Sequence, residues 1–384
     1  MLGERLRQAR LAAGLSLQSL ADKLEQPITR QALSRYETGA SQPGPTRIVE
    51  LATALNVSTS SLLTESAVRI RWVAYRKLAR LSKSRQEQLT ALAIQRLEGE
   101  LRLRELFHLG QKHDLPGPIE VHNLSHCDYA AATLRMRWNL GDRPVDGLIT
   151  LIEEHGVAVV SLPEALGFDG LSGWANDTPV LVLNRGMPPD RLRLNAAHEL
   201  GHLVMERTGD AKQDEQFAFR FAASFLVPPD AARRELGTRR RGLDLTELGL
   251  LKERWGLSMQ GWIRRARDLE IIGNDHYREL NVGFRRTGWH RTEPFTYEGR
   301  ESPALYRRLV RRALVERMIT SEDADRLYPG VSGSTAEAWV PSASLRDLAR
   351  RPRVERHLML RDAQVAVDPS DTEVWDTTLA DQVH

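Results

Sequence analysis

Two histidines four residues apart, His198 and His202, place the tightest constraint on how this chain can fold. Their segment follows a short apolar run at 180–183 and opens with a pair of prolines, which predicts a helix after a buried strand. On a helix this spacing puts both imidazoles on one face, one turn apart, where they can share a tetrahedral zinc ion. Glu199 then points beside the metal, as the general base toward a water molecule in an HExxH site. Gly201 disfavours the helix by about 1 kcal/mol relative to alanine, so we expect another backbone to approach closely there.

A catalytic zinc needs a third protein ligand. The extended HExxH spacing supplies no third histidine, so a carboxylate from the next predicted helix, which opens near Asp214, is the natural source. Glu215 shares a helix face with Phe219 and Ala222, the face expected to pack inward, and is our choice. Asp214 is the alternative, although it is better placed as an N-cap. Manganese or iron can use the same ligands as zinc.

Three other interpretations of this region stay open from the sequence. The histidines can be a pair on the surface of a basic helix. Glu215 can be a first-turn glutamate favoured by the helix dipole. The run 180–183 can bind an extended substrate by strand addition, or it can be a central strand with no free edge.

The N-terminal residues 1–65 alternate short amphipathic segments with turn residues, which predicts an all-α domain. Ser16 and Thr29 stand where helix N-caps are expected. Gly14 and Gly39 stand where helices end.

This block resembles the lambda-repressor-like, or XRE, helix-turn-helix family. The matching residues are Leu6-Arg7-x-Ala9-Arg10, Gly14-Leu15-Ser16, Gln18-x-Leu20-Ala21, Gln31-x-Leu33-Ser34-Arg35-Tyr36-Glu37-x-Gly39 and Pro43. The resemblance implies that the second helix of the motif enters the major groove by its N-terminal residues. The implied DNA contacts are Thr29, Arg30, Gln31, Ser34 and Arg35, with Gln18 placed to meet a phosphate.

Glutamine can bond adenine and arginine can bond guanine, but Arg35 can also pair with Glu37 instead. Residues 1–64 hold seven basic and five acidic side chains, a weak positive balance. Non-specific attraction to DNA is then weak, so we expect a homodimer on a double-stranded operator.

The metal-site region resembles the ImmA/IrrE family of metallopeptidases. The residues that carry this are Leu171-Ser172-Gly173-Trp174, Val180-Leu181-Val182-Leu183-Asn184, Asn195-Ala196-Ala197-His198-Glu199-Leu200-Gly201-His202 and Glu215-x-x-Ala218-x-x-Phe221-Ala222, ending Phe225-Leu226-Val227-Pro228. The family implies zinc held by two histidines and a glutamate, which fall on His198, His202 and Glu215. One departure is Phe219, where the family often has a polar residue that can support a ligand.

The expected organisation is multidomain. It comprises the all-α helix-turn-helix domain 1–65, a helical connector 66–115, an α+β zincin-like metallopeptidase domain with a small sheet 116–290, and a mostly helical C-terminal extension 291–384 of unknown role. The stretch 66–112 is strongly basic and lies near nucleic acid or forms a solvated helix face. We expect the residues from Ser370 onward, which are polar and acidic, to be disordered.

The composition of the chain also indicates the cellular compartment in which the protein is expected. The single cysteine, Cys127, cannot form an intramolecular disulfide, and the N-terminus lacks the apolar core of a signal peptide. No apolar run approaches the ~20 residues that span a bilayer. We therefore expect a soluble, cytoplasmic protein with no membrane association.

Together these features predict a transcriptional regulator whose zinc peptidase domain cleaves a protein, such as a repressor, in a stress or phage-related response. A second hypothesis is a regulator whose zinc domain senses a ligand or metal without proteolysis. A third is a peptidase that its helix-turn-helix merely localises on DNA. An intact HExxH motif argues against a decayed site but does not by itself prove turnover.

Overall fold

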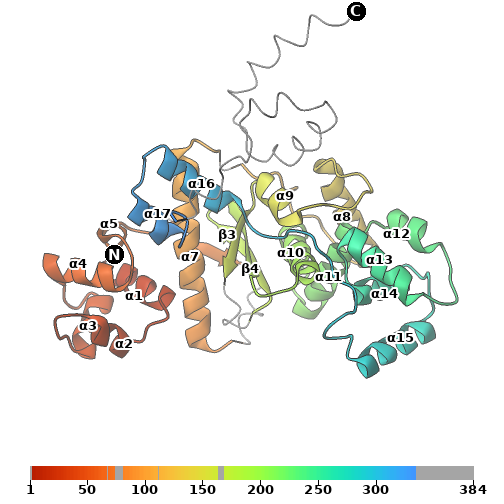
Figure 1. Cartoon of the computed structure of the whole chain (residues 1–384), viewed down its shortest axis with the longest axis horizontal. Coiled ribbons are helices and arrows are strands. Elements are labelled where there is room, and N and C mark those ends of the chain that lie inside the picture. The colour runs from red at the N-terminus through yellow and green to blue at the C-terminus, as the bar shows by residue number, and fades with distance from the viewer. Residues whose placement is uncertain (1, 67, 74–80, 111, 163–167, 334–384) are drawn as a thin grey trace, which may run out of the picture. The chain divides into compact units, whose positions relative to one another are not determined.

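The computed structural model describes residues 2–66, 68–73, 81–110, 112–162 and 168–333 (Figure 1). The chain divides into two units, 1–332 and 333–384, and the description below concerns the first. The disorder expected from Ser370 onward lies outside the described residues.

The N-terminal domain is all helical, as predicted. Its helices are α1 (Leu2–Ala12), α2 (Leu17–Lys23), α3 (Arg30–Thr38), α4 (Pro45–Ala54) and α5 (Thr59–Leu63). The predicted caps are confirmed, because Ser16 accepts a hydrogen bond from Ser19 N and Thr29 accepts one from Ala32 N. Gly39 ends α3 with a φ of 76°, a conformation that glycine adopts without strain. The domain closes over its own core of buried leucines, Leu6, Leu20, Leu33, Leu51 and Leu62.

The metal-site region contains a four-stranded sheet in the order β1-β3-β4-β2. The strands are β1 (Ile70–Trp72), β2 (Ala158–Leu162), β3 (Gly170–Ala175) and β4 (Thr178–Asn184). β2 runs parallel to β4, whereas β3 is antiparallel to both β4 and β1. β4 lies between β3 and β2, so the run 180–183 is a central strand with no free edge, and every residue of β4 is buried.

The sheet is covered on both faces, which explains the continuous apolar run in β4 (Figure 1). Val180 and Val182 belong to the core beneath α7 (Lys83–Leu106). Leu181 and Leu183 belong to the larger core beneath α10 (Pro189–Val204) and its neighbours. The other helices of that larger layer are α8 (Leu124–Arg137), α9 (Leu148–Glu154), α11 (Ala211–Leu226), α12 (Pro229–Leu236), α13 (Leu245–Trp255), α14 (Met259–Asp268) and α15 (Asn274–Thr287).

The segment that leads into α7 differs from the helical connector predicted for 66–115. Residues Ile70–Trp72 pair with β3 and extend the sheet by one strand. The leucines that recur at helical spacing in this connector, Leu89, Leu92, Leu97 and Leu101, all lie in α7 itself. The three residues of β1 are too few to show a period-two pattern that could compete with it.

Helix α7 contacts α1 of the N-terminal domain as well as the sheet. Arg5 Nη1 lies 2.7 Å from a carboxylate oxygen of Glu98, and Arg7 Nη2 lies 3.0 Å from one of Glu87. Ser66 Oγ also donates to Glu98. These pairs use acidic side chains of α7 and arginines of α1, so they do not neutralise the basic side chains of the stretch 66–112.

The residues after α15 belong to the same unit. Residues 293–301 form an extended segment, here called the strap, whose two ends contact different helices of this unit. At one end Glu293 accepts hydrogen bonds from the first backbone amides of α14 and pairs with Lys252 Nζ at 2.9 Å. At the other end Glu301 accepts from Leu148 N and Ile149 N and pairs with the fully buried Arg193 of α10. The strap thus ties α9, α10, α13 and α14 together.

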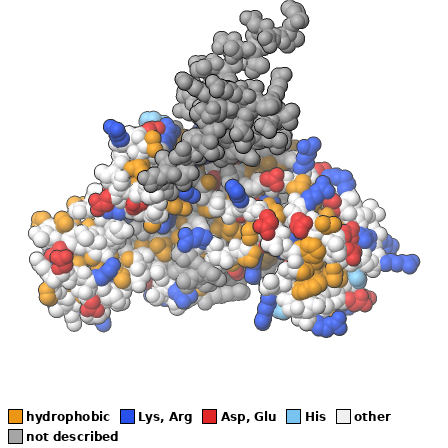
Figure 2. Space-filling view, in the orientation of Figure 1, with side chains coloured by type: hydrophobic (Ala, Val, Ile, Leu, Met, Phe, Trp, Pro, Cys, Tyr) orange, Lys and Arg blue, Asp and Glu red, His pale blue; other side chains and the backbone are white. Residues whose placement is uncertain are grey.

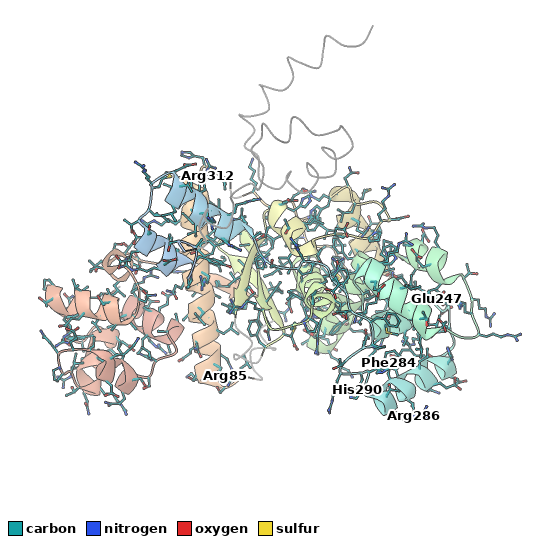
Figure 3. The ribbon with its side chains drawn as sticks, in the orientation of Figure 1. Arg85, Glu247, Phe284, Arg286, His290 and Arg312 are labelled. Atoms are coloured by element: carbon teal, nitrogen blue, oxygen red, sulfur yellow. The ribbon has the colours of Figure 1, made fainter. Side chains whose placement is uncertain are left out.

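The chain ends its described part in α16 (Leu305–Val315) and α17 (Ser321–Leu327), which pack on α7. Both helices agree with the mostly helical extension predicted for this part of the chain, and α16 carries four arginines. Arg312, labelled in Figure 3, stacks its guanidinium 4.2 Å from the ring centroid of Phe107 at the end of α7. The α16 N-terminus is capped by Glu153 of α9, which accepts from Ala304 N and Leu305 N.

Acidic and basic side chains are intermingled over the face shown in Figure 2, in keeping with a formal net charge of only +3. None of the helices in the described part combines the length and the apolar character that crossing a bilayer requires.

Replacing Glu301 tests the strap. Glu301→Ala leaves the Arg193 guanidinium buried without its carboxylate and removes the acceptor of two amides. We expect it to lower the free energy of unfolding by about 3–5 kcal/mol, measured by urea denaturation followed by tryptophan fluorescence. The exposed Glu298→Ala is the matched control. Equal stability of the two variants would contradict the strap's role.

Glu153 gives the fold a pH dependence. Burial raises the pKa of its carboxyl to about 7, against the lowering effect of the amides of Ala304 and Leu305. The folded state then holds this proton more tightly than the unfolded state, so its contribution to stability falls as pH rises from about 4.5 to about 7. In thermal melts, wild type should lose stability relative to Glu153→Gln across that window. A difference between the two that does not change with pH would contradict this.

Candidate functional site

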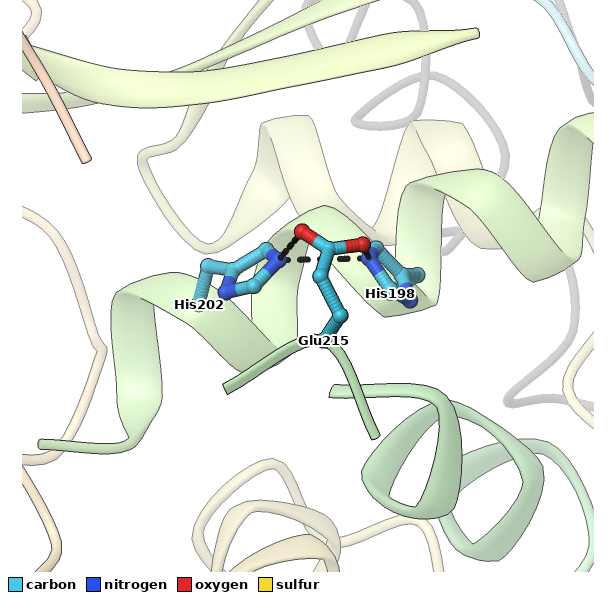
Figure 4. A group of neighbouring side chains, drawn as sticks. All are labelled: His198, His202 and Glu215. Carbon is cyan, nitrogen blue, oxygen red and sulfur yellow. Dashed lines mark hydrogen bonds and ion pairs between the residues drawn. The ribbon is translucent and has the colours of Figure 1, made fainter. Parts of the chain in front are cut away.

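Three side chains from two helices converge in the metal-site domain (Figure 4). His198 and His202 on α10 bring their Nε2 atoms within 3.2 Å of each other. The carboxylate of Glu215 on α11 lies 3.4 Å from His198 Nε2 and 3.3 Å from His202 Nε2. Zinc bonds of about 2.0–2.2 Å to tetrahedral ligands imply ligand-to-ligand separations of about 3.3–3.6 Å. The donor set and its spacing therefore fit one zinc ion.

The helix α10 is held rigidly where it carries the two histidines. Every residue from Ala196 to Val204 is buried, and both histidines are at least nine-tenths buried. Gly201 allows this packing, because a Cβ there would lie 2.9 Å from the ring of Phe221 on α11. The close approach expected at Gly201 thus comes from a side chain and not from another backbone.

Helix α11 begins at Ala211, earlier than predicted, with Asp210 as its N-cap. Asp214 is therefore not an N-cap. Its carboxylate accepts hydrogen bonds from the backbone amide and the hydroxyl of Thr208, both at 2.8 Å. Glu215, and not Asp214, lies with the two histidines. Its side chain is about one-third exposed, so the cluster is reached from that side.

Glu199 is held by the sheet. Its Oε2 accepts a hydrogen bond of 2.8 Å from Ser172 Oγ on β3, and the side chain is almost fully buried. Gly170, two residues earlier on the same face of β3, leaves room for it, because a Cβ there would lie 3.0 Å from Glu199 Cγ. Sequence reasoning gave Ser172 and Gly170 no role. The signals in the sequence were their alternate spacing on a strand that precedes the HExxH helix and, for Ser172, its place in a segment that carries the family resemblance.

Phe219 departs from the inward-facing position expected of it. Its side chain is half exposed, and its ring centroid lies 4.2 Å from that of His198. The ring covers one side of the His198 imidazole instead of supplying a polar bond to it. Cys127 is not a reactive thiol or a metal ligand, because burial raises the pKa of its thiol to about 12 and keeps it protonated.

The predicted DNA contacts lie on the surface of the N-terminal domain. Arg30 and Gln31 open α3 and are exposed, as is Arg35 one turn later, while Ser34 is half-buried. Thr29, also exposed, is the N-cap of α3. Gln18 is exposed on α2 and donates to Asp22 Oδ1 at 2.8 Å.

Glu37 does not pair with Arg35. Its two carboxylate oxygens accept from Nε and Nη2 of Arg10 on α1, at 2.6 and 2.8 Å. This bidentate pair fastens α3 to α1. It leaves the exposed Arg35 to project from the same helix as Arg30 and Gln31.

Comparison with known proteins agrees with this arrangement. Residues 152–266, which include the three clustered side chains and Glu199, match the family model of the IrrE N-terminal-like domain of the M78 peptidases. Residues 6–62 match a helix-turn-helix family model. The chain thus joins an XRE-type helix-turn-helix domain to an M78 metallopeptidase-family domain.

A relative of the chain is also described by its name as a helix-turn-helix protein. Over 63 residues the chain is 43% identical to the SPbeta prophage-derived uncharacterized HTH-type transcriptional regulator YonR of Bacillus subtilis (strain 168). The match covers 16% of the present chain and 56% of that protein, so the chain spans little more than half of this relative.

Metal analysis of single variants tests the cluster. His198→Ala, His202→Ala and Glu215→Ala should each reduce bound zinc from about one ion per chain to near zero, because two ligands hold zinc poorly. Asp214→Asn, the neighbouring control, should keep its zinc. Full zinc in Glu215→Ala would assign the third ligand elsewhere.

Proposed function

We propose that this chain is a DNA-binding transcriptional regulator whose zinc-dependent peptidase domain cleaves a protein substrate. The observation that carries the proposal is the convergence of His198, His202 and Glu215 beside a buried Glu199 that a strand serine orients. A surface pair of histidines needs neither a third ligand at coordinating distance nor a positioned glutamate.

Zinc is the metal that this donor set favours, and manganese or iron can use the same ligands. When bound, zinc polarises a peptide carbonyl and makes a water molecule more acidic. The chain's own residues then perform the proton transfers.

Glu199 is the general base and later the general acid. Its carboxylate takes a proton from the attacking water and passes it to the nitrogen of the leaving amine. Ser172 Oγ fixes one carboxylate oxygen, and Gly170 lets the carboxylate stand against the strand. These contacts reduce the number of carboxylate orientations and so favour the productive one.

The N-terminal domain is proposed to bind a specific DNA sequence. Gln31 and the exposed arginines Arg30 and Arg35 are proposed to read base edges, with Thr29, Ser34 and Gln18 toward the backbone. A single domain with a small positive charge binds DNA weakly, so a homodimer on two half-sites is the expected binding form.

The substrate is proposed to be a repressor or another regulator in a phage-related or stress response. The support is that a relative of the chain, a helix-turn-helix regulator by its name, is described as prophage-derived. A regulator of this kind gains from a peptidase, because cleavage makes release from repression irreversible.

Glu199→Gln separates proteolysis from binding. The amide cannot accept the proton, so cleavage of a peptide library, prepared from a digested denatured protein and read by mass spectrometry, should fall about 10²–10⁴-fold. Zinc content and affinity for an operator selected from random duplexes should not change. Glu206→Gln, an exposed glutamate just after α10, is the matched control and should cleave normally.

Gln31→Ala is the reciprocal variant. It should lose about 1–3 kcal/mol of operator affinity and keep zinc and cleavage. The peptidase proposal would be overturned if zinc-loaded wild type cut no more peptides than Glu199→Gln. Regulation without cleavage would then favour the sensing hypothesis.

A further inference from the structure

The outer edge of β3 is occupied by a strand from the connector. In the β1–β3 register Ile70 faces Ala175 and Trp72 faces Gly173. The next residue, Val73, donates its amide to Ser172 O at 2.9 Å. The pairing is antiparallel, so the connector runs along β3 in the direction from Ala175 toward Gly170.

This edge and the general base meet at one residue. The backbone carbonyl of Ser172 accepts from Val73, while its hydroxyl donates to Glu199. A peptide paired with β3 in the same direction passes next along Leu171 and Gly170. Gly170 is the residue whose Cα stands against the Glu199 side chain.

We propose that β1 is an internal competitor of the substrate: it occupies the outer edge of β3, along which an extended peptide would reach Glu199, and the substrate must displace it. This inference rests on the proposed peptidase function and names its substrate class. The substrate is an extended segment that adds to β3 by main-chain hydrogen bonds.

The strand β1 has the features of an edge strand that another strand can replace, although Ile70 and Trp72 pack against the core beneath α7. It is three residues long, and Ile70, Arg71 and Trp72 are all exposed or only partly buried. In contrast, every residue of β4 is buried on the inner side of β3. A short edge strand contributes few ladder bonds, so an added strand of similar length can compete with it.

The edge also selects side chains. A Cβ on Gly173 would lie 2.8 Å from Arg71 O, 3.1 Å from the indole of Trp72 and 3.2 Å from Ile70 Cγ2. Gly173 therefore provides a flat surface over which two large apolar side chains, two residues apart, can lie. A substrate that follows β1 carries such a pair, and its scissile bond lies on the carboxyl side of that pair.

The test removes the competitor and measures capture of a probe. Val73→Pro deletes the amide that bonds Ser172 O, whereas Val73→Ala keeps the amide and changes only the side chain. Both are made in full-length Glu199→Gln, so that the probe is not consumed. The probe is a fluorescein-labelled peptide of residues 69–73, followed by fluorescence anisotropy. Val73→Pro should bind it at least ~10-fold more tightly than Val73→Ala.

Two controls locate the binding. The same peptide carrying Arg71→Pro should bind poorly, because it cannot complete the ladder. Adding Gly173→Ala to Val73→Pro should abolish capture, since the new methyl group occupies the space where the added strand lies. Equal affinity of Val73→Pro and Val73→Ala, or capture that survives Gly173→Ala, would overturn the proposal.

If Val73→Pro does not fold, a reversible disulfide between β1 and β3 provides a second test. Ile70 and Ala175 face each other across the two strands, so Ile70→Cys with Ala175→Cys can join them by a disulfide. In an active background the oxidised protein should cleave the peptide library at least ~10-fold more slowly than after dithiothreitol. Equal rates before and after reduction would overturn the proposal.

The two proposals fail in different ways. Capture of the probe by Val73→Pro, with no cleavage by any zinc-loaded variant, would support the edge and overturn the peptidase. Cleavage by wild type that neither Val73→Pro nor the disulfide changes would support the peptidase and overturn the edge.

Discussion

The structure depends on a single sheet buried between helices on both of its faces. The central strand β4 sends Val180 and Val182 toward α7 and Leu181 and Leu183 toward α10. Because α10 carries both histidines and Glu199, the packing of this helix against the sheet sets the position of the His198–His202–Glu215 cluster. The buried side chains of α10 leave it no alternative register against the sheet.

The chain completes this core from both ends. The connector adds β1 to the sheet and α7 to one face, and the strap 293–301 closes the opposite side through Glu293 and Glu301. Arg193, which anchors the strap, lies five residues before His198 on the same helix. A region that the sequence presented as an extension of unknown role is therefore bound to the helix that bears the site.

Helix α7 also explains how two domains of different function share one chain. It packs on the sheet through Leu89, Ala93 and Leu97, and it pairs with α1 through Glu98 and Glu87. Glu98 is bonded to Ser66 as well, a few residues before β1. The short segment from Ser66 to Trp72 therefore contacts α7 at the place where α7 pairs with α1, and it also supplies the strand that occupies the edge of β3.

The sequence by itself determined the local parts of this protein. The caps at Ser16 and Thr29, the helix under His198 and His202, and the buried strand 180–183 follow from short-range patterns, because neighbours along the chain decide them. The pairing of Glu37 with Arg10, the bond from Ser172 to Glu199 and the strand β1 join residues far apart in sequence. Only the tertiary structure decided those, since a side chain's spacing along the chain does not say which distant group will be packed against it.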